Sequence, residues 1–243
     1  MRTILILHGW GSCAKNWAKV KEILESKGYK VNVPDLPGFG ENPPPEKPWS
    51  VDDYVEWVRN YCQKNNIPHI FLIGHSFGGG IAIKFSCAFP EIVLKLVLVA
   101  PAFRRRRSLK QIVFLLLAKL GKVVFTVTGL ILLWPLEKKI KSFLYRIAGT
   151  TDYYRLDLNG MVAMKETFKK VTREDLVYCL PKIKSPTLIV WGAKDVMTPI
   201  KEAYLAKKEI NNAELEIIKD GLHGLSLQKP NILVEKIIRF INN

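Results

Sequence analysis

Short apolar segments alternate with longer helical patterns along most of this 243-residue chain. The apolar segments are nearly continuous hydrophobic runs, as expected of parallel strands that are covered on both faces. Strands that alternate with helices predict an α/β protein with a mostly parallel central sheet and right-handed crossover connections. We expect strands at 3–7, 30–34, 70–73, 94–99, 187–190 and 215–218, and helices at 15–26, 51–64, 78–89, 201–209 and 231–241.

The alternation stops at residue 101 and resumes near residue 186. Within this interval, 166–180 has the pattern of an ordinary sheet-flanking helix. The part before it differs, because four consecutive arginines at 104–107 are followed by apolar runs broken by lysines. We therefore assign residues 1–101 and 166–243 to the α/β core and residues 102–165 to an insertion after the strand at 94–99.

Composition excludes several classes of protein. With 48% hydrophobic and 24% charged residues, the chain is not a disordered segment, a collagen-like fibre or a polytopic membrane protein. The four cysteines occur singly, which argues against a structural zinc site and a dense disulfide framework. The apolar run at 3–7 is too short for a signal-peptide core. We expect a cytoplasmic protein, with peripheral contact to a membrane left open.

The positive charge is concentrated in one segment. The net charge is +15, and residues 101–150 contain eleven basic residues and one acidic residue. A basic surface can bind nucleic acid, anionic lipid or an acidic substrate. No nucleic-acid-binding motif accompanies this charge, so we expect no nucleic-acid partner. Contact with an anionic membrane stays open.

One motif indicates nucleophilic catalysis. Gly74-His75-Ser76-Phe77-Gly78 fits the pattern G-x-S-x-G and lies between an expected strand and an expected helix. Small residues on both sides permit a tight turn that exposes Ser76, and the Phe77 N–H at the start of the helix is available to an oxyanion. The alternative is a glycine-rich turn with an incidental serine.

A catalytic serine needs a base to take its proton. Of the four histidines, His223 follows the strand at 215–218 on a glycine-flanked loop and is our candidate. His75 is adjacent to Ser76 and cannot fold back onto its hydroxyl, and His69 is expected on the surface. We expect His8, directly after the first strand, to hold its loop, with direct catalysis as the lesser alternative.

The imidazole needs a carboxylate that fixes its tautomer. Asp195 lies just past the strand at 187–190, at the edge where parallel sheets place their sites. Asp220 is the alternative, but its closeness in sequence to His223 disfavours the required geometry. The order Ser76, Asp195, His223 is that of the α/β-hydrolases.

Five motifs in sequence order resemble the α/β-hydrolase superfamily: LHGWG, DLPGFG, GHSFGG, WGAKD followed by Pro199, and DGLHGLSLQKP. The first two are similar to those of small carboxylesterases of the pimeloyl-methyl-ester type. The resemblance covers nearly the whole chain and implies that His8 and Gly9 lead into a loop whose Trp10 N–H is a second oxyanion donor. It also implies that 102–165 forms a helical cap. One departure is that the family's N-terminal hairpin is expected to be absent.

Residues 112–134 contain only two charges, so a membrane span has to be considered. A single crossing there would separate Ser76 from Asp195 and His223, so we expect none. Two interpretations of the cap remain open: helices that line an acyl site, or a surface that also lies on anionic lipid.

The sequence thus predicts a serine hydrolase, most specifically a carboxylesterase for small or medium acyl esters or thioesters. No metal or organic cofactor is implied. The same residues could support carbon–carbon bond hydrolysis, perhydrolysis or acyl transfer. An alternative of another class is a non-catalytic binding or membrane-associated protein on this fold. Oligomeric state is not predicted.

Overall fold

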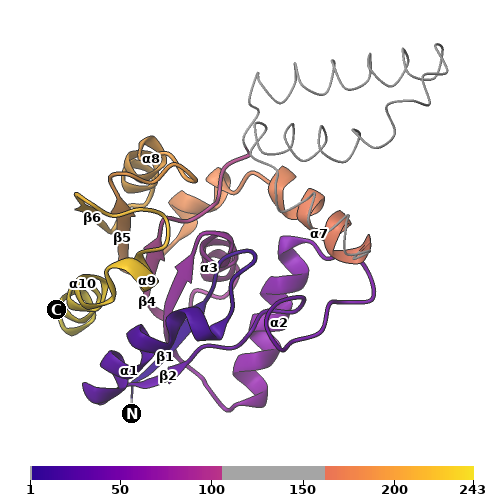
Figure 1. Cartoon of the computed structure of the whole chain (residues 1–243), viewed down its shortest axis with the longest axis horizontal. Coiled ribbons are helices and arrows are strands. Elements are labelled where there is room, and N and C mark those ends of the chain that lie inside the picture. The colour runs from indigo at the N-terminus through magenta and orange to yellow at the C-terminus, as the bar shows by residue number, and fades with distance from the viewer. Residues whose placement is uncertain (1, 106–161) are drawn as a thin grey trace, which may run out of the picture.

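The computed structural model describes residues 2–105 and 162–243. In this part of the chain, six strands form one sheet in the order β2-β1-β3-β4-β5-β6, and all neighbours pair in parallel (Figure 1). The parallel α/β architecture expected from the sequence is confirmed. The strands are β1 (Thr3–Leu7), β2 (Lys30–Asn32), β3 (Ile70–His75), β4 (Val93–Val99), β5 (Thr187–Gly192) and β6 (Ala213–Ile218).

Helices connect the strands, as each parallel crossover requires. Ser50 and Asp53 form a reciprocal capping box at the start of the second long helix, which fixes where it begins. The helices are α1 (Ala18–Ser26), α2 (Val51–Lys64), α3 (Phe77–Ala88), α7 (Val162–Arg173), α8 (Lys201–Glu209), α9 (Leu225–Gln228) and α10 (Pro230–Asn242), with 3₁₀ turns η1 (Ala14–Trp17) and η3 (Val177–Lys182).

The helices cover both faces of the sheet. Alternate side chains of a strand point to opposite faces, so Leu5 and Leu7 pack with α2 and α3, whereas Ile4 and Ile6 pack with α1 and α10. All four are fully buried. This two-sided burial explains why the strands are read as continuous apolar runs, and it makes the sheet a rigid support for the loops at its edge.

Most elements differ from their predicted extents by a few residues, and two of these differences have a clear local cause. The expected strand at 30–34 ends at Asn32, two residues before Pro34, which has no N–H to donate to a sheet. The expected single helix at 166–180 is divided: α7 ends at Arg173, and the Asp175 carboxylate then accepts a hydrogen bond from the Val177 N–H at 3.1 Å. This local turn starts η3 and ends the continuous helix.

The predicted cap at 102–165 falls mostly outside the described residues, because 106–161 are not described. At its two ends, Phe103 and Met164 are buried in the same core cluster as α2 and α3. Within the described residues, no helix combines the length and apolarity that a membrane crossing needs. The stretch 112–134, weighed above as a span, belongs to the part that is not described.

Candidate active site

Ser76 lies in a strained turn between β3 and α3. Its backbone angles are φ 51° and ψ −115°, values typical of the first central residue of a type II′ turn, a position dominated by glycine. Three backbone hydrogen bonds hold this conformation: the Ser76 N–H donates to Val99, and the N–H groups of Gly80 and Ala102 donate to the Ser76 carbonyl. Such strain persists only where the surroundings over-determine it, most often at functional sites.

The two glycines of the motif allow the close approach on which this turn depends. A Cβ atom at Gly74 would lie 2.6 Å from the Gly78 carbonyl oxygen. A Cβ atom at Gly78 would lie 2.2 Å from the Leu7 carbonyl oxygen of β1. Neither position therefore has room for a side chain, and the spacing G-x-S-x-G follows from packing between β1, β3 and α3.

Asp195 and His223 meet at the carboxyl ends of β5 and β6. These strands are neighbours, so their following loops lie side by side, joined by a backbone hydrogen bond from Lys194 to Gly221. The His223 Nδ1 atom is 2.7 Å from Asp195 Oδ2. The alternative carboxylate, Asp220, instead forms an exposed ion pair with Lys194 at 2.9 Å.

The Asp195 carboxylate is buried and fully hydrogen-bonded. Its Oδ1 accepts from the backbone N–H groups of Met197 and Thr198, and its Oδ2 accepts from the Thr198 hydroxyl at 2.7 Å as well as from His223. Burial alone would raise its pKa, but the hydrogen bonds from His223 and Thr198 outweigh burial and hold the pKa of Asp195 below its ordinary value. Asp195 is therefore an ionised acceptor at neutral pH.

This contact also sets the tautomer of His223. A carboxylate can only accept, so the proton of a neutral His223 ring lies on Nδ1, and Nε2 carries the lone pair. A nitrogen in this state can accept a proton from a neighbouring hydroxyl group. The pair Asp195–His223 thus lies at the same sheet edge as Ser76, which directly follows β3.

His8 is a buried structural histidine in the loop after β1. Its Nε2 accepts a hydrogen bond from the Leu36 N–H at 2.9 Å, so its Nδ1 carries the proton and donates to the Gly9 carbonyl. Burial is the main cause that lowers the pKa of His8, which keeps the ring neutral. His8 therefore ties the loop after β1 to the loop after β2.

This loop passes directly beside Ser76. A Cβ atom at Gly9 would lie 3.2 Å from the Ser76 Cβ. The Trp10 ring contacts the rings of Phe39 and Phe77, with centroids 4.8 and 5.2 Å away. Phe77 is the first residue of α3, where backbone N–H groups have no acceptor within the helix. The backbone at Gly9 thus lies beside Ser76, and the Trp10 ring packs against Phe77 at the start of α3.

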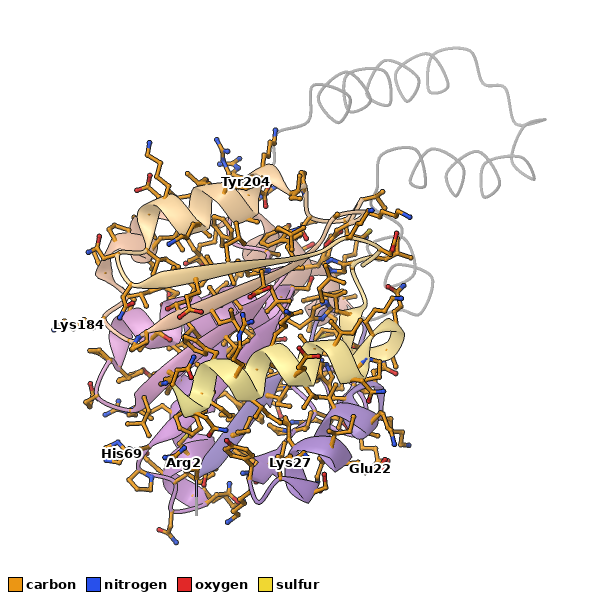
Figure 2. The ribbon with its side chains drawn as sticks, turned by 90° about the vertical axis from the view of Figure 1, so that its left-hand side faces the viewer. Arg2, Glu22, Lys27, His69, Lys184 and Tyr204 are labelled. Carbon is orange, nitrogen blue, oxygen red and sulfur yellow. The ribbon has the colours of Figure 1, made fainter. Side chains whose placement is uncertain are left out.

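The remaining histidines have other surroundings. His69 precedes β3, at the end of the strand opposite Ser76, and is exposed (Figure 2). Its Nδ1 atom is 3.2 Å from the Glu91 carbonyl oxygen. His75 is buried, and burial, followed by the charge of His223, lowers its pKa to about 4. Among the described residues, no cluster of three His, Cys, Asp or Glu side chains is arranged to hold a metal ion.

Sequence reasoning missed two features of this site. Thr198 donates to Asp195, and its only sequence signal is its position three residues after an aspartate, a spacing typical of a local turn. The contact between His75 and the backbone of His223 joins positions 148 residues apart and has no local signal.

Comparison with known proteins identifies the family. The sequence model of a protein family described as the alpha/beta hydrolase fold matches residues 2–230 of this chain. The chain belongs to this family. The fold and the resemblance inferred from the five motifs are therefore confirmed.

Two similar proteins and one solved structure illustrate the range of similarity. The human protein monoacylglycerol lipase ABHD6 is 27% identical over 98% of this chain and 75% of its own length. The 2-hydroxy-6-oxononadienedioate/2-hydroxy-6-oxononatrienedioate hydrolase of Escherichia coli K12 is 24% identical over 98% of this chain and 86% of its own length. The crystal structure of MGS-MChE2, an alpha/beta hydrolase enzyme from a lagoon-sediment metagenome, has a TM-score of 0.69 and 25% identity, and covers 99% of this chain and 90% of that protein.

Proposed function

We propose that this protein is a serine hydrolase that cleaves carboxylic esters or thioesters through an acyl-enzyme on Ser76. One observation carries the proposal: the 2.7 Å contact between His223 and a buried, ionised Asp195 lies at the sheet edge that holds Ser76 in its strained turn. A nucleophile, a base and a group that orients the base are the parts that acyl transfer requires.

In the proposed mechanism, the Ser76 hydroxyl attacks the substrate carbonyl while His223 Nε2 accepts its proton. Asp195 stays ionised and stabilises the imidazolium that forms. The N–H groups of Trp10 and Phe77 would stabilise the oxyanion, and loss of one such donor typically costs about 10²–10³ in rate. His223 then protonates the leaving group, and a water molecule activated by the same base hydrolyses the acyl-enzyme.

An acyl ester is the substrate class that we favour. The human relative is named a monoacylglycerol lipase, and the E. coli relative is named for hydrolysis of an oxo-dienedioate. The two names describe different chemistry, and the ester-cleaving relative is the more similar of the two by identity. Small or medium acyl chains are proposed, and hydrolysis of a carbon–carbon bond is the alternative if no ester is turned over.

The test is turnover of p-nitrophenyl esters from acetate to palmitate by the wild type, Ser76→Ala and Ser86→Ala. Ser86 is the matched control, because it lies on the same helix but donates to the Ala82 carbonyl, away from the site. We expect turnover by the wild type and Ser86→Ala and a loss of at least about 10³-fold in Ser76→Ala. Equal turnover by Ser76→Ala, or no turnover of any ester by the wild type, would overturn the proposal.

A second arm of this experiment addresses the membrane. Adding vesicles of anionic lipid tests the proposal that the basic segment at 101–150 brings the protein to such a surface. Activation that requires anionic lipid supports this contact. Turnover of short esters that is indifferent to vesicles contradicts it.

A further inference from the structure

His75, the residue before Ser76, contacts the backbone of the candidate base. Its Nε2 atom is 2.9 Å from the carbonyl oxygen of His223. The two imidazole rings lie close together, with centroids 4.8 Å apart. One contact therefore joins the turn that holds the candidate nucleophile to the loop that holds the candidate base.

The chemistry of this contact fixes the protonation of His75. A carbonyl oxygen can only accept, so Nε2 carries a proton and donates it. The lowered pKa of about 4 keeps the ring neutral, so Nδ1 carries no proton at neutral pH. That Nδ1 is buried and has no hydrogen-bond partner among the described residues. His75 thus acts as a donor through one atom only, and Nε2 is not free to accept a proton from Ser76.

The position of this hydrogen bond makes it a tether for a loop. His223 lies between β6 and the short helix α9, in a segment without regular structure that contains Gly221 and Gly224. Its side chain is held by Asp195, and its carbonyl accepts from the His75 ring and from the Leu225 N–H. Of these two donors, only His75 belongs to a different part of the fold, the rigid end of β3.

We propose that His75 is a positioning residue that fixes the backbone of His223 relative to Ser76, so that the imidazole held by Asp195 faces the serine hydroxyl. This inference rests on the proposed function. His75 touches no reacting atom in this scheme. Its contribution is geometric: a buried donor on β3 sets where the base can lie, and a misplacement of about 1 Å between reacting groups can cost about 10²-fold in rate.

A matched pair of variants tests the tether. In His75→Gln, the amide nitrogen can replace the Nε2 donor, whereas His75→Met has a similar length and no donor. We expect His75→Met to lower kcat by about 10- to 100-fold with KM within about 2-fold of the wild type, because substrate binding is not touched. We expect His75→Gln to recover most of the loss. Equal kcat in the two variants would overturn the inference.

A spectroscopic readout separates positioning from a general effect on packing. The Nδ1 proton that His223 shares with Asp195 should give a far-downfield proton NMR signal, which does not depend on turnover. We expect this signal in the wild type and in His75→Gln, and its broadening or loss in His75→Met. A sharp, unchanged signal in a folded His75→Met protein would contradict the tether.

The same series distinguishes failure of the inference from failure of the proposed function. If the wild type and Ser76→Ala turn over esters equally, the proposed function is wrong, and the NMR comparison of Gln and Met still decides whether His75 holds the His223 loop. If turnover depends on Ser76 but His75→Met and His75→Gln have the same kcat, the proposed function stands and the role of His75 is refuted. Circular dichroism melts establish that each variant is folded.

Discussion

Replacing Ser76 by glycine should stabilise the protein while removing its candidate nucleophile. Ser76 adopts φ 51° and ψ −115°, a region that residues with a side chain rarely occupy. Glycine reaches this region freely, so Ser76→Gly would release the strain. Ser76→Ala keeps a Cβ atom and therefore the strain, and it is the matched comparison.

The magnitude follows from two opposing terms. A residue held in such a region costs about 1–3 kcal/mol. Glycine loses more conformational freedom on folding than a residue with a side chain, which costs about 0.5–1 kcal/mol. We therefore expect Ser76→Gly to be more stable than Ser76→Ala by about 1 kcal/mol, with Ser76→Ala within about 0.5 kcal/mol of the wild type.

Equilibrium urea unfolding at pH 7 measures this difference directly. The three proteins should have the same dependence of unfolding free energy on urea, with a higher midpoint for Ser76→Gly. Ala100, which is buried at φ 44°, provides an independent replicate, and Ala100→Gly should also gain stability. A Ser76→Gly protein less stable than Ser76→Ala would refute the claim that this turn stores strain.

Three further predictions concern neighbouring residues. Thr198→Val removes the hydroxyl donor to Asp195 and should cost about 1.5–3 kcal/mol of unfolding free energy in urea, more than Thr198→Ser; equal costs would contradict the role of the hydroxyl. Gly78→Ala places a Cβ atom 2.2 Å from the Leu7 carbonyl oxygen and should cost at least about 1–3 kcal/mol, so an unchanged melting temperature would refute this packing. In the unfolded chain, His75 has an ordinary pKa of 6.5, whereas in the folded protein its pKa is about 4. Between these two values the unfolded chain binds more protons than the folded protein. The free energy of unfolding should therefore decrease as the pH falls across this window, by up to about 1.4 kcal/mol per pH unit. Calorimetry should show a shallower slope in His75→Gln; a slope equal to that of the wild type would contradict the assignment.

Much of the fold could be predicted because burial leaves a clear trace in the sequence. Strands such as β1 and β5 are covered on both faces, so nearly every residue in them is apolar. The G-x-S-x-G turn could be recognised because close packing leaves no room for a side chain at Gly74 and Gly78. The division of the predicted helix at 166–180 could not, because it depends on one hydrogen bond from Val177 to Asp175 rather than on apolar periodicity.

The candidate site divides in the same way. Asp195 and His223 could be chosen because each follows a strand, and adjacent parallel strands bring their following loops together. The hydrogen bonds of Thr198 and His75 could not be predicted from the sequence. Thr198 donates to the Asp195 carboxylate and His75 to the His223 carbonyl, and only the folded chain brings these groups together. Hydrogen bonds that support a site have no periodicity for a sequence to display.

The most direct test of Ser76 as nucleophile is covalent labelling by a fluorophosphonate, followed by mass spectrometry of the peptides. The label should be found on Ser76 in the wild type, be absent from this position in Ser76→Ala, and form more slowly in His223→Ala and Asp195→Asn, because the hydroxyl then lacks an oriented base. Labelling of another residue at the wild-type rate in Ser76→Ala, or no labelling of the wild type, would contradict the assignment of this site.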